Sequence, residues 1–315
     1  MPSERALVGA AGSAVEIVEV GPRDGLQNER TVVPTAAKIA YIQALVDAGA
    51  RRIEATSFVH PTRVPQLADA EDVMAGVPRF AGLSYIGLIV NGRGLDRALA
   101  AGMDEVNVVV VATETFSQRN QGMTVAEGVR SFAAISSRAR AAGLRVTATV
   151  GASFGCPFEG EVAPASVAAL VRQCAAAGAD EIALADTIGV AVPADVVRLV
   201  DATREVTDLP LRFHFHNTRN TGYANALIAL ALGAAALDSS TGGIGGCPFA
   251  PAATGNIATE DLAYALRRSG ISTGLDLSAL VSAAALIGRE LGMVLPALLG
   301  RAGDFPGSLS PERTV

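Results

Sequence analysis

The sequence contains no tryptophan, only 4 tyrosines and only 3 cysteines in 315 residues. With so few aromatic residues, a surface on which nucleic-acid bases stack is not expected. The cysteines are Cys156, Cys174 and Cys247, an odd and sparse set that argues against a disulfide framework. Free thiols suit a reducing compartment, so we expect a cytoplasmic protein.

Long apolar runs and one-sided positive charge are also missing. No uninterrupted apolar run approaches the ~18 residues that span a bilayer. The first 14 residues hold no apolar stretch of the length found in secretory signals. Lys and Arg number 25 against 31 Asp and Glu, and they form no basic stripe. We therefore expect neither a membrane segment nor a nucleic-acid partner.

The residues that are present suit one large α/β domain. Half are hydrophobic and 18% are charged, which provides material for a large core. Short β-branched runs alternate with longer Ala- and Leu-rich segments, a pattern typical of βα units and a parallel sheet. The predicted strands are Val15–Val20, Arg52–Ala55, Leu83–Val90, Glu105–Val111, Arg145–Val150, Glu181–Ala185, Leu211–His216 and Ala236–Ser239. The predicted helices between them are Pro34–Ala48, Gly92–Ala101, Val125–Ala142, Pro164–Ala177, Pro193–Thr207 and Gly222–Leu232.

A helix–Gly–strand phrase recurs along the chain, for example at Ala48-Gly49-Ala50, where the glycine supplies a left-handed helix cap. The eight predicted strands with their helices favour a closed TIM (β/α)8 barrel, and an open doubly wound sheet is the alternative. We expect residues 1–13 to be a tail, 14–274 the barrel, and 275–315 a helical extension and tail. The last predicted helices are Thr259–Arg268, which completes the barrel, Leu277–Leu291 and Leu295–Arg301.

Polar residues gather where these strands end, which is where TIM barrels carry their active sites. His214 and His216 point to the same side of a strand, because side chains alternate along it. With the carboxylate of Asp24 they form a plausible divalent-metal site, and the alternative is a pair of hydrogen-bonded barrel-lining residues. Arg23 next to Asp24 suits an anionic substrate.

A glycine-rich segment from Thr241 to Pro248 follows the eighth strand. It is either a flexible loop or a lid whose backbone approaches a ligand. It lacks the lysine and spacing of a nucleotide-binding loop. Cys247 within it is the thiol best placed to act as an acid or nucleophile.

Several short motifs stand out along the chain. They are residues 18–29 (VEVGPRDGLQNE), 53–59 (IEATSFV), 155–160 (GCPFEG), 186–189 (DTIG), the two histidines, 242–248 (GGIGGCP), 254–256 (TGN) and 259–261 (TED). Together they resemble the 3-hydroxy-3-methylglutaryl-CoA lyase family, within a metallolyase superfamily that includes condensing synthases. The resemblance extends from about residue 15 to about residue 274.

The resemblance implies a metal-dependent carbon–carbon lyase acting on an acyl-CoA substrate. The implied ligands of Mg²⁺ or Mn²⁺ are Asp24, His214, His216 and Asn256. Arg23 would stabilise the enolate, Cys247 would return a proton, Glu54 would orient Arg23 or the proton relay, and Asp186 would hydrogen-bond near the hydroxyl or act as the base. The residues expected to contact substrate are Gln27, Thr187, Gly245 and Gly246.

The segment 217–220 (NTRN) departs from the family, because Asn220 stands where a bacterial branch usually has glycine. Because that branch includes lyases that act on bulkier 3-substituted glutaryl-CoA esters, such an ester is an alternative substrate. A condensing synthase gives no reason for Cys247, and a non-catalytic barrel would be expected to lose metal ligands. We also expect a homo-oligomer, either a dimer or a tetramer.

Overall fold

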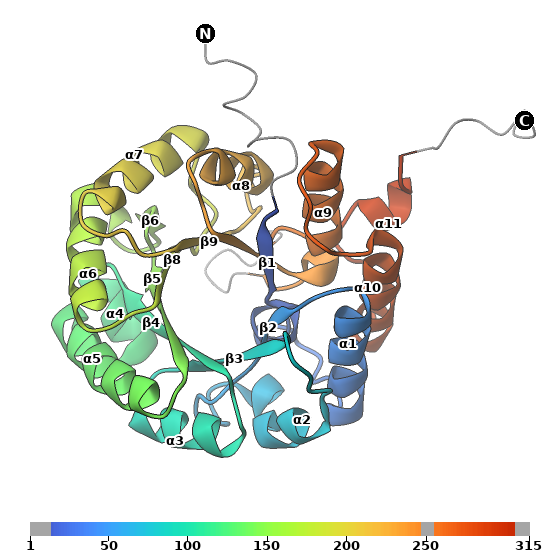
Figure 1. Cartoon of the computed structure of the whole chain (residues 1–315), viewed down its shortest axis with the longest axis horizontal. Helices are drawn as coiled ribbons and strands as arrows, with labels where there is room; N and C mark the ends of the chain where they lie inside the picture. Colours follow the sequence, from blue (N-terminus) through green and yellow to red (C-terminus); the bar gives the residue numbers. More distant parts are fainter. Residues whose placement is uncertain (1–13, 247–254, 306–315) are drawn as a thin grey trace, which may run out of the picture.

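The computed structural model describes residues 14–246 and 255–305, and a closed barrel of eight parallel strands lies at their centre (Figure 1). The strands follow one another around the barrel in the order β1-β10-β9-β8-β5-β4-β3-β2. They are β1 (Glu16–Glu19), β2 (Arg52–Ser57), β3 (Ser84–Ile89), β4 (Glu105–Val111), β5 (Arg145–Gly151), β8 (Glu181–Asp186), β9 (Leu211–Phe215) and β10 (Ala236–Ser239). The predicted TIM barrel is confirmed, and the open sheet is excluded by the pairing of β1 with both β2 and β10.

A ring of helices surrounds the barrel in Figure 1. It comprises α1 (Thr35–Asp47), α2 (Ala70–Gly76), α3 (Gly92–Ala100), α5 (Val125–Ala141), α6 (Pro164–Ala176), α7 (Pro193–Arg204), α8 (Gly222–Ala231) and α9 (Thr259–Arg268). The repeated glycine phrase ends helices as expected. At Gly49, φ is +100°, and a Cβ there would lie 2.4 Å from the carbonyl oxygen of Gly274. Only glycine therefore suits that position.

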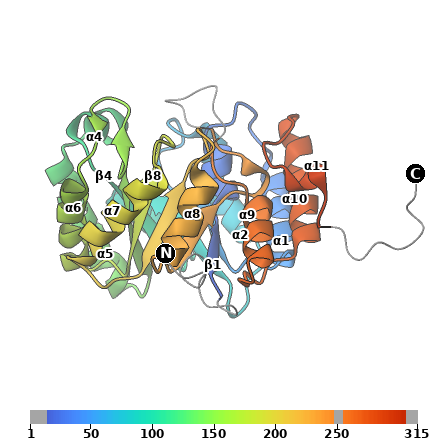
Figure 2. The same ribbon diagram turned by 90° about the horizontal axis from the view of Figure 1, so that it is seen from above.

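Three short features were not predicted from the sequence. They are α2, α4 (Glu114–Gln121), and a hairpin of β6 (Gly155–Cys156) with β7 (Gly160–Glu161). Helix α4 is polar and buries only Phe116 and Ser117, so it carries no apolar stripe that periodicity could reveal. It follows β4 at the end of the barrel where the strands finish (Figure 2).

The C-terminal extension forms α10 (Leu277–Leu291), which packs against α1 and α9. The predicted helix at Leu295–Arg301 is wrong in extent, because α11 covers only Leu299–Ala302. Pro296 disfavours helical geometry at Leu295, and the N–H of Ala297 instead donates to Gly242 O at 3.1 Å. In the described ranges, no helix has the length and hydropathy needed to span a bilayer.

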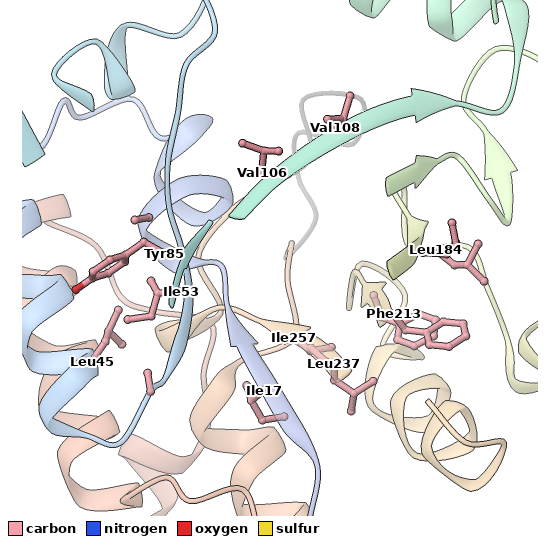
Figure 3. Packing of buried hydrophobic residues seen from close by; sticks show 14 of the residues in the cluster. Ile17, Leu45, Ile53, Tyr85, Val106, Val108, Leu184, Phe213, Leu237 and Ile257 are labelled. Carbon is pink, nitrogen blue, oxygen red and sulfur yellow. The ribbon is translucent and has the colours of Figure 1, made fainter. Parts of the chain in front are cut away.

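The main core lies between the barrel and its helices. Along each strand alternate residues face outward, so Ile53 of β2 and Phe213 of β9 join helix residues such as Leu45 in one buried cluster (Figure 3). Val18 on β1 belongs to a separate small cluster, whose other members are Val20, Ile86 and Ala236. These are inward-facing positions, so apolar packing fills only part of the barrel interior.

Charged side chains fill much of the rest. Arg52 begins β2 and donates to Glu105 of β4 at 2.7–3.0 Å and to Glu181 of β8 at 2.8–2.9 Å. Arg212 of β9 is fully buried, and its Nε lies 3.5 Å from Glu181 and 3.4 Å from Asp238. Burial is offset here by pairing, which holds the pKa of Glu181 down at about 2. This ionic layer closes the end of the barrel where the strands begin.

Candidate active site

The residues after β1 form a π-helical turn, Gly21–Gly25. The N–H groups of Asp24 and Gly25 both donate to Val20 O, at 2.8 and 3.2 Å. A Cβ on Gly21 would lie 2.4 Å from the Tyr41 hydroxyl, so glycine is required for this close approach. π-helical turns are rare and gather at functional sites. This one presents Arg23 and Asp24 to the barrel mouth.

Asp24, His214 and His216 meet at this mouth. Oδ2 of Asp24 lies 3.8 Å from Nε2 of His214 and 4.0 Å from Nε2 of His216, and the two Nε2 atoms are 3.0 Å apart. Three donor atoms, all within 4.8 Å of one another, can bind one cation. One carboxylate oxygen and two imidazole nitrogens suit a first-row divalent ion or Mg²⁺, so the residues fit the expected metal.

Asn256 lies beside this triad. Its amide nitrogen donates to Asp24 Oδ2 at 2.9 Å and to Ile244 O at 3.0 Å, and its backbone pairs with His216 in an isolated antiparallel bridge. Gly245 makes this arrangement fit, since a Cβ on it would lie 2.5 Å from the Asn256 amide. The four predicted ligands are therefore brought together, although they come from three distant parts of the chain.

The two imidazoles of the triad are buried and Asp24 is partly buried, and neighbouring groups set their charges. Burial opposes ionisation of Asp24, yet the guanidinium charge of Arg23, with smaller contributions from the two histidines, holds its pKa well below the usual range. Burial and the adjacent His214 lower the pKa of His216 to about 3. An ionised carboxylate beside a neutral imidazole is the state that binds a metal ion.

Arg23 is held by a hydrogen-bonded chain that crosses the barrel. Its Nη2 donates to Glu54 Oε2 at 2.7 Å, and Nη1 contacts Asp24. The amide of Asn107 donates to Glu54 Oε1 at 2.9 Å, and Thr149 donates to Asn107 Oδ1 at 2.6 Å. Nε of Arg23 is buried and has no partner within the described residues, so it remains available to an acceptor.

Arg23 and the triad line one cavity of about 810 Å³, whereas Glu54 and Asn256 lie behind its lining residues. The site residues predicted from the sequence that line this cavity are Arg23, Asp24, Gln27, Thr187, His214, His216 and Gly246. Its lining also includes the apolar residues Val109, Phe116 and Met123. A space of this size takes a small molecule of several functional groups.

Asp186 is placed differently from our expectation. It belongs to β8 but shares the outward parity of Ile182 and Leu184, and it does not line the cavity. Its two oxygens accept the backbone N–H groups of Val190 and Ala191, at 2.9 and 3.1 Å. Burial raises its pKa to about 6. In this position the carboxyl group holds the loop that leads to α7.

Two other predicted residues, Thr187 and Gly246, line the cavity and accept hydrogen bonds from neighbouring segments. Thr187 Oγ1 accepts the N–H of Ala152 at 2.9 Å, and Gly246 O accepts the side-chain amide of Asn28 at 3.1 Å. A Cβ on Gly255 would lie 1.5 Å from Gly245 O, so these two backbones touch. Cys247 lies outside the described residues.

Among the polar cavity residues missed from the sequence, three lie on barrel strands: Asn107, Thr149 and Asp238. Each occupies an inward position of a correctly predicted strand. The alternation of side chains along each strand could have identified them. Asp238 is two residues after the first residue of β10 and Asn107 two after the first of β4, and residues two apart on a strand face the same side.

A family model described as HMGL-like matches residues 14–287. The chain belongs to the HMGL-like family. It is 44% identical over 285 residues to the mitochondrial hydroxymethylglutaryl-CoA lyase of Mus musculus, covering 90% of this chain and 88% of that protein. It is 43% identical over 301 residues to the (R)-citramalyl-CoA lyase of Chloroflexus aurantiacus, covering 92% and 95%. A solved structure of an HMG-CoA lyase from Acinetobacter baumannii, in complex with coenzyme A and 3-methylmalate, matches with a TM-score of 0.89 at 41% identity, covering 95% and 97%.

These relationships confirm the resemblance drawn from the motifs. They also confirm that the chain is an enzyme of the carbon–carbon lyase class. HMGL-like lyases depend on a divalent metal, and the triad of Asp24, His214 and His216 fits that requirement.

Proposed function

We propose that this enzyme cleaves 3-hydroxy-3-methylglutaryl-CoA to acetyl-CoA and acetoacetate, as in leucine degradation, with Mg²⁺ or Mn²⁺ as cofactor. The observation that carries the proposal is the metal-fitting triad, with Arg23 beside it, inside one cavity. The 44% identity to a hydroxymethylglutaryl-CoA lyase supports the substrate. The complex of the Acinetobacter baumannii relative with coenzyme A supports an acyl-CoA ligand.

The reaction breaks the bond between C2 and C3 of the substrate. The tertiary hydroxyl loses its proton and becomes the ketone of acetoacetate, while the bonding electrons pass to the enolate of acetyl-CoA. That enolate then takes a proton at C2. The active site must therefore hold a hydroxyl and a carboxylate at one end and stabilise a developing oxyanion at the other.

When bound, the metal would lower the pKa of a coordinated hydroxyl, as it does for water. Asp24, His214, His216 and Asn256 would hold it. Their oxygen and nitrogen donors, without a thiolate, favour Mg²⁺ or Mn²⁺.

Arg23 is the residue that we assign to the thioester oxygen. Its guanidinium is buried, remains charged, and has a free Nε within the described part of the chain. A preorganised cation of this kind stabilises charge as it develops in the transition state. Glu54 keeps the guanidinium in place through the bond to Nη2.

Cys247 is proposed as the acid that returns the proton to C2. Gly245 and Gly255 bring the two backbones that flank its segment into contact beside Asn256. Gln27, Thr187 and Gly246 line the same cavity and are proposed to contact the substrate. The homo-oligomer expected from the sequence remains a prediction.

A second candidate substrate is (R)-citramalyl-CoA, favoured by the 43% identity to the Chloroflexus aurantiacus enzyme. It carries the same tertiary alcohol and thioester, but its acid arm is one methylene shorter and its second product is pyruvate. Within the first candidate, a bulkier 3-substituent stays an alternative.

Product analysis separates these candidates. We expect acetoacetate from 3-hydroxy-3-methylglutaryl-CoA, in the presence of Mg²⁺ or Mn²⁺. We expect kcat/KM for this ester to exceed that for (R)-citramalyl-CoA by about 10–200-fold, the usual range for one methylene. Faster release of pyruvate would transfer the assignment to citramalyl-CoA. Faster cleavage of a longer 3-alkyl ester would select the bulkier substrate, and no cleavage of any of the three would refute the proposed function.

A further inference from the structure

Asp238 of β10 contacts the ring nitrogen of His214 that faces away from the triad. Its Oδ2 lies 3.2 Å from Nδ1 of His214, and both side chains are buried. The two residues are register partners on neighbouring strands. We propose that Asp238 is a positioning residue for the metal centre, which fixes the tautomer and orientation of His214. This inference rests on the metal centre of the proposed function, although its tests need no substrate.

The hydrogen-bond chemistry gives the direction of the effect. An ionised carboxylate only accepts hydrogen bonds, so the proton between the two groups belongs to Nδ1 of His214. Its Nε2 then carries the lone pair, which faces Nε2 of His216 at 3.0 Å. Nε2 of His214 also lies 3.8 Å from Asp24 Oδ2, on the side where the metal would bind. A carboxylate placed behind a ligating imidazole also raises its basicity as a ligand.

Arg212 contacts the Asp238 carboxylate from the other side and so helps to hold it against His214. It lies two residues before His214 on β9 and is fully buried, with Nε 3.4 Å from Oδ1 of Asp238. Each of its guanidinium nitrogens lacks a hydrogen-bond partner within the described residues, so Asp238 and Glu181 supply its nearby negative charge. A buried cation therefore faces one oxygen of Asp238, while its other oxygen faces His214.

His216 provides an internal contrast. Its Nδ1 is also buried, but it has no hydrogen-bond partner in the part of the chain that the structure describes. The two imidazoles of the triad are therefore held differently. Loss of Asp238 is expected to disturb His214 alone.

The first test is Asp238→Asn, compared with Glu105→Gln as a matched control. Both changes remove one buried negative charge from the barrel interior, but Glu105 contacts Arg52 and not His214. Mn²⁺ affinity is measured by following the free ion with electron paramagnetic resonance. We expect Asp238→Asn to weaken binding by about 10–100-fold, the usual effect of losing such a partner, and Glu105→Gln to leave it unchanged. Equal affinities in the two variants would overturn the inference.

The second test uses the metal-free wild-type protein and therefore does not depend on a variant that folds. The chain has only 3 histidines, so long-range ¹H–¹⁵N correlation spectra resolve each ring. We expect the proton of His214 on Nδ1. A proton on Nε2 instead would overturn the inference. If no ester is cleaved while these results hold, the proposed function fails and the role of Asp238 stands.

Discussion

Nη2 of Arg23 lies 2.7 Å from Oε2 of Glu54, a carboxylate that is fully buried on the neighbouring strand β2. The other oxygen of Glu54 is bound by the amide of Asn107. The guanidinium is therefore oriented before any substrate arrives, and little reorganisation remains for the reaction itself. Such preorganisation is the main source of electrostatic catalysis.

Removal of the Arg23 guanidinium should lower the turnover rate and leave the affinity for the metal ion unchanged. We expect Arg23→Met to lower kcat by about 10²–10³-fold, the usual effect of losing an oxyanion donor, with Mn²⁺ affinity retained. Steady-state kinetics and Mn²⁺ titration measure the two effects separately. A variant with nearly wild-type kcat would remove Arg23 from the proposed mechanism.

Glu54→Gln tests the orientation of Arg23 while keeping the cation. Because a hydrogen bond between charged groups contributes about 1.5–3 kcal/mol, we expect kcat to fall by roughly 10–100-fold. KM should change much less, since Glu54 is proposed to act through Arg23. Glu105→Gln, in the same barrel interior, serves as the control: it should lose stability, since Glu105 belongs to the ion network around Arg52, but the folded enzyme should keep its kcat. An equal loss in both variants would indicate a general effect of barrel charge.

Most of the fold was accessible from the sequence because strand and helix periods are local. Most of the eight strands follow from β-branched runs, whereas the polar helix α4 carries no apolar pattern. His214 and His216 could be paired from their spacing alone. The contact between Asp238 and His214 could not, because it depends on the register between two strands, and Asp186 was assigned to the site without its outward parity.

The histidines allow a matched test of the metal ligands. His214→Ala and His216→Ala should each weaken Mn²⁺ binding strongly, since each removes one of the three clustered donors. His60→Ala should not, because the His60 ring is exposed and bonds to Thr62. Chelation should abolish activity, and added Mg²⁺ or Mn²⁺ should restore it. Unchanged affinity in His214→Ala would refute its assignment as a ligand.

Glu260 should make stability depend on pH. It is buried on α9, where its carboxylate accepts the N–H of Gly242, and burial raises its pKa to about 8. The folded state thus holds a proton that the unfolded chain releases near 4.5. The associated stability is present at low pH and is lost as the pH rises toward 8, at up to about 1.4 kcal/mol per pH unit.

Glu260→Gln removes this dependence because an amide does not titrate. Urea unfolding of both proteins at several values between pH 5 and pH 8 should show the wild type losing stability relative to the variant as pH increases. Parallel curves would mean that Glu260 is already ionised in the folded state.

The backbone conformation of Asn220 shows how the chain accommodates asparagine where related sequences usually have glycine. Its φ is +59°, a left-handed conformation that asparagine tolerates better than most residues. We expect Asn220→Gly to keep the stability of the wild type and Asn220→Val to lose about 1–2 kcal/mol, the cost of that conformation for a residue with a bulky Cβ. Equal unfolding midpoints for the two variants would contradict the strain argument.

The ionic layer formed by Arg52, Glu105 and Glu181 has a consequence for how this barrel can change over evolutionary time. Removing one member of a buried ion network costs about 3–5 kcal/mol, whereas exchanging the whole set for packed apolar residues can be neutral. Single substitutions at these positions are thus selected against even though they lie far from the chemistry. Related chains should either keep all three charges or have replaced them together.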